Sequence, residues 1–230
     1  NGGLYRGSKP VMWSVVEKTA LAEAEVEYHD HVSPTIWVKF PIVAVGRDGL
    51  EADQHLLGAN VVIWTTTPWT IPGNRAVAFS EKITYGVYEV IDAGDAYGAS
   101  KGERFVLADA LADEVKAAAH VVEWKRLDVD VDPSQLVCAH PLRGQGYEFG
   151  INVFAGDFVT DETGTGFVHI APGHGQDDYL LGMKHGVEVP FTVDEAGVYY
   201  DDVPLFAGKR VLKPNGKDGD ANNAVIVALK

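Results

Sequence analysis

Two segments of the sequence gather the side chains that could do chemistry, and the first of them is rich in threonine. It reads VVIWTTTPWTIPGN at residues 61–74, where an apolar run leads into three consecutive threonines, a Pro-Trp pair and a fourth threonine. On an extended strand Thr65 and Thr67 would share one face and Thr66 the other, which would place two hydroxyls near Trp69. Such hydroxyls could orient a substrate, or they could simply cap the backbone of a loop.

The second segment, GTGFVHIAPGHGQDDY at residues 164–179, combines histidines, glycines and carboxylates. It predicts a strand that contains His169, a glycine-flanked loop that contains His174, and a helix that starts with Asp177 and Asp178. Glycines let the backbone turn tightly and approach a ligand closely. A carboxylate at a helix start beside two histidines could bind a substrate ammonium, ligate a metal or cap the helix. For Asp177 we expect a capping or solvated position.

Other common catalytic arrangements are absent from the sequence. The histidines and aspartates of the second segment match neither the helical His-Glu-x-x-His arrangement nor a cysteine–histidine zinc pattern. No G-x-S-x-G elbow and no phosphate-binding P-loop occur. The single cysteine, Cys138, lies in the apolar stretch QLVCAHPL, which favours a buried structural thiol over a nucleophile. We therefore predict no metal and no cofactor.

Composition limits the classes of partner. The 19 basic and 33 acidic residues give a formal net charge of −14, which argues against strong autonomous binding to a phosphate backbone. No secretory signal is visible at the N-terminus, and no apolar run approaches the roughly 20 residues of a membrane span. The sequence therefore predicts a cytoplasmic protein that does not associate with a membrane.

Short runs of β-branched and aromatic residues, divided by turn signals, predict most of the strands. These strands fall at 35–45, 60–66, 75–79, 85–91, 121–127 and 158–171, the last broken by a glycine turn. Turns of hairpin length are expected at 47–49 and 72–74. Helices are expected at 108–119 and 176–185. The strands favour one closed or strongly curved sheet.

The two segments together resemble a known pair of motifs. TTTPWTIPGN, followed about a hundred residues later by GTGFVHIAPGHGQDDY, resembles the signature of the editing insertion of class I aminoacyl-tRNA synthetases for branched aliphatic amino acids. The stretch from KPVMWSVV to TIWVKF, residues 9–40, resembles the segment that leads into that insertion. Valyl and leucyl enzymes resemble TTRPET or TTRPDT at the threonine segment, so TTTPWT indicates the isoleucyl branch.

The resemblance implies a fold and a domain organisation. The fold class would be α+β, with a β-barrel editing domain at 35–219 and peripheral helices. Residues 1–34, which combine a ribbon-like piece near 9–16 with a helix-favouring run at 19–28, would form a lead-in segment. Residues 220–230 would form a truncated C-terminal helix, because NNAVIVALK is apolar and lacks a stop signal.

The resemblance also implies an activity and its partners. It implies an aminoacyl-tRNA hydrolase that proofreads by removing valine from valyl-tRNA(Ile), with valyl-adenylate as a second substrate. The partners would be the aminoacylated 3′ end of tRNA(Ile), its valine moiety and the remainder of the synthetase. The synthetic-site signatures His-Ile-Gly-His and Lys-Met-Ser-Lys-Ser are absent, so no synthetic activity is expected. A tRNA-end binding module without autonomous activity and a metal-dependent hydrolase remain as alternatives.

Site residues follow from the resemblance, position by position. Asp178, directly before Tyr179, takes the place of the aspartate that holds the substrate α-ammonium, and we assign it a catalytic role with Thr66 and Thr67. His169 takes the place of a wall that limits side-chain size. The complete set of predicted substrate-binding residues is Thr65, Trp69, Thr70, Asn74, His169 and His174.

Overall fold

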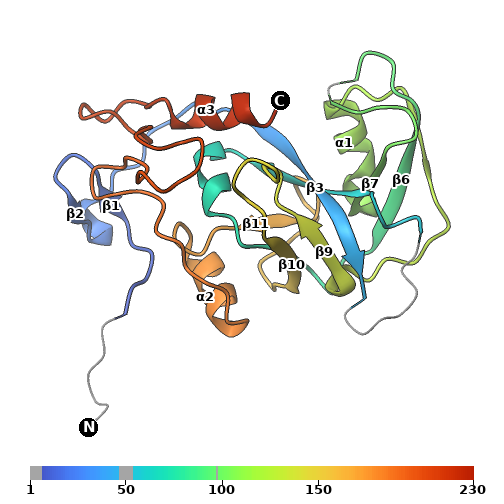
Figure 1. Ribbon diagram of the computed structural model, residues 1–230, viewed down its shortest axis with the longest axis horizontal. Helices are drawn as coiled ribbons and strands as arrows, with labels where there is room; N and C mark the ends of the chain where they lie inside the picture. The colour runs from blue at the N-terminus through green and yellow to red at the C-terminus, as the bar shows by residue number, and fades with distance from the viewer. Residues whose placement is uncertain (1–6, 47–53, 97) are drawn as a thin grey trace, which may run out of the picture. The chain divides into compact units, whose positions relative to one another are not determined.

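The computed structural model describes residues 7–46, 54–96 and 98–230. They divide into two compact units, whose elements are coloured along the chain in Figure 1. The sheet unit comprises Thr35–Thr66, Ala76–His169 and Ala228–Lys230. The loop-rich unit comprises the residues up to Pro34, Thr67–Arg75 and Ile170–Val227. We describe each unit by itself.

Nine strands form one mixed sheet. They are β3 (Ile36–Val45), β4 (Asn60–Thr65), β5 (Ala76–Phe79), β6 (Tyr85–Asp92), β7 (Arg104–Ala108), β8 (Glu123–Arg126), β9 (Leu136–Ala139), β10 (Gly150–Ala155) and β11 (Val168–Ile170). Their hydrogen-bonded order is β11-β5-β10-β9-β3-β4-β7-β6-β8. The pairs β4–β7 and β5–β10 are parallel, so the fold is a mixed α/β arrangement with few helices.

The long strand β3 joins the two halves of the sheet (Figure 1). Its first part pairs with β4, from Ile36 opposite Thr65 to Pro41 opposite Asn60. Its last part pairs with β9, from Ile42 opposite Cys138 to Val45 opposite Leu136, with a register shift between Ile42 and Ala44. An irregularity of this kind bends a strand and increases its local twist, and strands that change partners make the corners of curved sheets. The register shift therefore lies in the strand that pairs with both halves of the sheet.

The predicted closed barrel is not found among the described strands, because their order ends at β11 on one side and at β8 on the other. β8 is a short strand with sequence EWKR, and its charged residues Glu123, Lys125 and Arg126 are exposed. Short, charged strands are a common way to protect the edge of a sheet from further pairing. The chemistry of β8 therefore suits an edge rather than a closing strand.

The sheet unit has an apolar core with one helix packed against it. Alternate residues of β3, namely Val38, Phe40 and Ile42, are buried, as the period of a strand requires. The helix α1 (Ala112–Ala118) follows the short 3-10 helix η3 (Asp109–Leu111) and contributes Val115 to a cluster with residues of β6 and β7. A further 3-10 helix, η4 (Pro133–Gln135), precedes β9. Cys138 in β9 is fully buried, and burial raises the pKa of its thiol to about 12, which confirms the predicted structural cysteine.

The described residues of the loop-rich unit form short elements. These are the ribbon strands β1 (Trp13–Ser14) and β2 (Thr19–Ala20), the 3-10 helices η1 (Glu23–Glu25) and η2 (Pro68–Gly73), and the helices α2 (Gln176–Lys184) and α3 (Ala221–Ala228). Its almost wholly buried side chains include Ile71, Tyr199, Phe206 and Val225. The unit therefore has an apolar centre of its own, built from segments far apart in the sequence.

Several element predictions need correction. Residues 158–167 form turns and bends, and only Val168–Ile170 of the predicted strand pairs. Residues 72–74 close the 3-10 helix η2 instead of a hairpin, because β4 and β5 are not neighbours in the sheet. The helix-favouring run at 19–28 forms only β2 and η1. The turn predicted at 47–49 lies outside the described residues.

Within the residues that the structure describes, no helix combines the length and apolarity that crossing a membrane would require.

Candidate functional site

The threonine segment changes from strand to helix inside the motif. Thr65 is the last residue of β4 and is buried, Thr66 is half-buried, and Thr67 is exposed with φ −124° and ψ 67°. Pro68 follows at the first position of η2, where its fixed φ and missing N–H suit a helix start. Since the strand ends at Thr65, the prediction that Thr65 and Thr67 share one strand face is wrong.

Hydrogen bonds inside η2 engage the hydroxyl of one threonine and the carbonyl of another. The backbone N–H and the hydroxyl of Thr70 both donate to the carbonyl of Thr67, at 3.0 and 2.8 Å. The N–H of Asn74 donates to the carbonyl of Ile71 at 2.9 Å. Thr70 and Asn74 are buried, so both side chains belong to the interior of this segment.

Trp69 is held on three sides by residues from later segments. Its backbone N–H donates to Asn222 Oδ1 at 3.0 Å, and its carbonyl accepts a hydrogen bond from the hydroxyl of Tyr199. Its ring meets the imidazole of His174 edge to face, with centroids 4.6 Å apart and an interplanar angle of 71°. The structure thus brings together two predicted residues, Trp69 and His174, within the loop-rich unit.

His174 is an uncharged histidine at neutral pH. Burial lowers the pKa of its imidazole from 6.5 to about 4. Its Nε2 lies 2.8 Å from Thr192 Oγ1, and its backbone N–H donates to the carbonyl of Ala171. Gly73 leaves room for the ring, because a Cβ there would lie 3.1 Å from His174 Cδ2 and 3.2 Å from Nε2. The imidazole can therefore act as a hydrogen-bonding and packing group but not as a cation at neutral pH.

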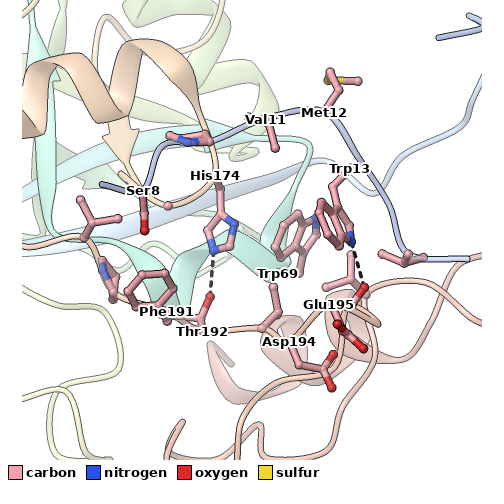
Figure 2. A pocket seen from close by; sticks show the side chains of 18 of the residues that line it. Ser8, Val11, Met12, Trp13, Trp69, His174, Phe191, Thr192, Asp194 and Glu195 are labelled. Carbon is pink, nitrogen blue, oxygen red and sulfur yellow. Dashed lines mark hydrogen bonds between the residues drawn. The ribbon is translucent and has the colours of Figure 1, made fainter. Parts of the chain in front are cut away.

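A cavity of about 600 Å³ lies beside Trp69 and His174 (Figure 2). Its walls are mainly apolar, with Trp13 and Phe191 among them, and His174 and Thr192 supply polar atoms. The indole N–H of Trp13 donates to the backbone carbonyl of Glu195 at 2.8 Å, as Figure 2 shows. All lining residues belong to the loop-rich unit. Asp178 is not among them.

The two neighbouring aspartates of α2 have different surroundings. Asp177 is exposed in the first turn, which confirms its predicted solvated position. Asp178 is half-buried, and its Oδ1 accepts the backbone N–H of Ala171 at 2.7 Å. Burial raises the pKa of Asp178, while the hydrogen bond from Ala171 opposes that rise. Asp178 is thus a fixed, partly desolvated carboxylate, whereas Asp177 is a solvated one.

The predicted site residues divide between the two units. Thr65, Thr66 and His169 belong to the sheet unit, where His169 is 8% exposed in β11. The loop-rich unit holds the remaining predicted residues, Thr67, Trp69, Thr70, Asn74, His174 and Asp178. Both motif segments therefore pass from one unit to the other, after Thr66 and after His169. Among the described residues, no group of three or more His, Cys, Asp or Glu side chains is placed to hold a metal.

Three residues that hydrogen-bond to Trp69 or His174 were not predicted from the sequence: Thr192, Tyr199 and Asn222. Tyr199 and Asn222 lie 130 and 153 residues after Trp69, and each bonds its backbone. Thr192 lies 18 residues after His174. Neither motif nor spacing marks these positions, and Asn222 carries only the weak signal of a polar residue at the start of an apolar helix.

Comparison with known proteins gives the family. A family model described as "tRNA synthetases class I (I, L, M and V)" matches residues 1–135. Because that match covers more than half of the 230 residues, the chain belongs to this family of class I tRNA synthetases.

Within that family the chain is similar to isoleucine–tRNA ligases over its whole length. It is 53% identical to the enzyme of Bradyrhizobium diazoefficiens, with 100% of this chain and 24% of the relative covered. It is also 53% identical to that of Rhodopseudomonas palustris, with 100% and 23% covered. These matches confirm the predicted isoleucyl branch. The chain spans about a quarter of the length of the curated relatives that it matches.

A solved structure described as "The crystal structure of GlLeuRS-CP1" is also similar. It has a TM-score of 0.47 and 17% sequence identity, and the match covers 69% of this chain and 70% of that one.

Proposed function

We propose that this chain is an editing hydrolase that releases valine from valyl-tRNA(Ile). Membership of the class I tRNA synthetases and full-length similarity to part of isoleucine–tRNA ligases support the tRNA substrate. The observation that carries the proposal is the half-buried carboxylate of Asp178, fixed by the N–H of Ala171 while Asp177 remains in solvent. A fixed carboxylate is the group that an α-ammonium requires.

Hydrolysis of an aminoacyl ester requires few catalytic groups from the protein. An aminoacyl ester is already activated, so hydrolysis needs no covalent intermediate and can rely on positioning of the ester and a water. Asp178 pairs with the substrate ammonium. The hydroxyls of Thr66 and Thr67, with nearby backbone amides, orient the ester and stabilise the charge that develops on its oxygen. Valyl-adenylate presents the same ammonium and an activated carboxyl, and is the second substrate.

Selectivity in this proposal is steric. One methylene is worth only about 1–3 kcal/mol in a hydrophobic pocket, and discrimination between isoleucine and valine by isoleucyl enzymes is the standard illustration of that limit. A second site that admits only the smaller side chain overcomes it. We assign the wall of that site to His169, a buried residue of β11.

The test is release of valine from valyl-tRNA(Ile) by the purified protein, compared with isoleucyl-tRNA(Ile) and repeated with a chelator. We expect valine release well above the uncatalysed rate, no release of isoleucine, and no effect of the chelator. Binding of the tRNA end without release would instead support a binding module. Loss of activity with the chelator, restored by a divalent metal, would support a metal-dependent hydrolase.

A further inference from the structure

The short helix η2 has a backbone donor that its own turns cannot satisfy. The first N–H groups of a helix lack acceptors within it and must find partners elsewhere. In η2 the first residue, Pro68, has no N–H, so the N–H of Trp69 is the first that needs a partner. That partner is Asn222 Oδ1 in α3, at 3.0 Å. A helix cap that is normally local is supplied here from 153 residues further along the chain.

The carbonyl of the same residue is also held from a distance. The hydroxyl of Tyr199 donates to Trp69 O, and Tyr199 is only 2% exposed. The ring of Tyr199 packs against Phe206, with centroids 5.8 Å apart. Because the ring is buried and packed, its hydroxyl is confined to one position. Both polar backbone groups of Trp69 are therefore fixed by side chains.

The side chain of Trp69 is fixed by a second pair of contacts. Its ring rests against His174, and His174 is bonded to Thr192 at 2.8 Å. His174 and Thr192 line the cavity in Figure 2, whereas Asn222 and Tyr199 do not line it. Two kinds of residue can thus be separated: those that face the cavity, and those that act only through the Trp69 backbone.

We propose that Asn222 and Tyr199 are positioning residues of the editing site. Their hydrogen bonds fix the peptide groups on both sides of Trp69, and thereby set its ring and the neighbouring residues Thr67 and Thr70. This proposal rests on the proposed function, since it concerns the orientation of that site. In this proposal Asn222 and Tyr199 act only through the backbone of Trp69, so their loss changes the geometry of the reaction and not the groups that bind.

The chain offers a matched pair of variants in one helix. Asn222→Ala removes the acceptor for Trp69, and Asn223→Ala changes an exposed neighbour with the same side chain. In the 230-residue chain we expect Asn222→Ala to lower kcat for valyl-tRNA(Ile) about tenfold or more with KM within about twofold, because misplacement by about 1 Å can cost about a hundredfold in rate. Asn223→Ala should leave both constants unchanged.

Two further variants separate positioning from folding. Asn222→Asp keeps an oxygen that can accept the N–H of Trp69, so it should restore most of the kcat lost in Asn222→Ala. Tyr199→Phe keeps the packed ring and removes only the donor, so it should lower kcat at constant KM. A residue with a purely structural role would reduce the folded fraction without changing turnover per folded molecule.

Tryptophan fluorescence provides a readout that does not depend on activity. The chain contains five tryptophans, and subtraction of the same protein with Trp69→Phe isolates the signal of Trp69. Asn222→Ala should shift this signal and Asn223→Ala should not. An active wild-type protein whose kcat is unchanged by Asn222→Ala and Tyr199→Phe overturns the positioning role, with or without a fluorescence shift. A wild-type protein that releases no valine contradicts the proposed function instead.

Discussion

Two adjacent carboxylates at the start of α2 illustrate how environment separates residues of the same type. Asp177 faces solvent, where its charge is stabilised by water and by the positive end of the helix dipole. Asp178 has lost part of its solvent and is held by the N–H of Ala171. A partly desolvated charge interacts more strongly with a bound cation than a solvated one does. Of the two aspartates, Asp178 is therefore the one that we propose as the ammonium anchor.

Replacement of the two aspartates should have unequal effects. We expect Asp178→Ala to lower kcat/KM for valyl-tRNA(Ile) by far more than tenfold, because removing one partner of a desolvated charge pair costs about 2–5 kcal/mol. Asp177→Ala should keep most of the activity. The measurement is single-turnover deacylation by both variants. Equal losses in the two variants would show that the assignment of the anchor is wrong.

The decrease in deacylation rate at low pH should reflect protonation of the same carboxylate, Asp178. Burial raises the pKa of Asp178 above its ordinary 3.8, so protonation should remove the anchor at a pH above that of a solvated aspartate. Bound ammonium favours the ionised form, so the acidic limb of kcat should lie at lower pH than the limb of kcat/KM. Rate profiles from about pH 3 to about pH 8 measure both limbs, and coincident limbs near the ordinary value of 3.8 would contradict this interpretation.

The size limit of the site should depend on His169. His169→Ala removes a buried imidazole ring and would make room for the extra methylene of isoleucine, while the charge at Asp178 is unchanged. We expect the variant to release isoleucine from isoleucyl-tRNA(Ile) as well as valine from valyl-tRNA(Ile). If His169 is only a core residue, a cavity would destabilise the fold and both activities would fall together. Comparing the two substrates on the folded variant distinguishes these outcomes.

At the scale of elements, the sequence predicts, at least in part, six of the nine strands in the described sheet. β3 alternates over ten residues and is predicted, and so are the four-residue strands β5 and β8, whereas β7, β9 and β10, with four to six residues, are not. The run at 158–167 has strand-like composition, but it contains glycines with positive φ at Gly164 and Gly166 and forms turns. Short runs carry too few residues for periodicity to decide their state.

The site was predictable to the extent that it lies in local motifs. Two of the candidate residues, His174 and Asp178, belong to one contiguous segment, and the sequence of that segment alone shows an imidazole and a carboxylate four residues apart. Tyr199 and Asn222 act on Trp69 from 130 and 153 residues away, through packing that no local pattern encodes. The division of the threonines between two units also depends on tertiary structure, because β4 ends within the motif.

The contact between η2 and the loop of His174 is tightest at Gly73. Gly73→Ala would place a methyl 3.1 Å from the imidazole, closer than a Cβ normally approaches another atom, so the ring or the backbone must shift slightly. Overpacking of this kind typically costs about 1–3 kcal/mol, and deacylation should fall as well. Chemical denaturation measures the loss of stability. In a His174→Ala background the methyl has room, so Gly73→Ala should lower the free energy of unfolding only slightly there. An equal loss of stability in both backgrounds would show that this contact is not the cause.

At the scale of the whole molecule, the distribution of charge opposes binding of a polyanion. The chain carries a formal net charge of −14, and several of its basic side chains already face a carboxylate. Such pairs are Lys18–Glu195, Lys39–Glu103, Arg126–Asp109, Arg143–Glu148 and Lys209–Asp220. The chain spans about a quarter of its curated relatives, so in the proposed function most phosphate contacts fall to the remainder of a synthetase.

The salt dependence of tRNA binding should therefore be weak for the 230-residue chain. Each phosphate neutralised by a protein cation contributes a slope of about −0.7 to −0.9 to the logarithm of the binding constant against the logarithm of salt concentration. With several of its cations paired and its net charge negative, the chain should bind tRNA(Ile) weakly and with a slope no steeper than about −2. Titrations between about 50 and 200 mM salt measure this slope. A slope steeper than about −5 would require a basic surface that recognises the tRNA backbone directly, and the chain would then not depend on a larger enzyme for affinity.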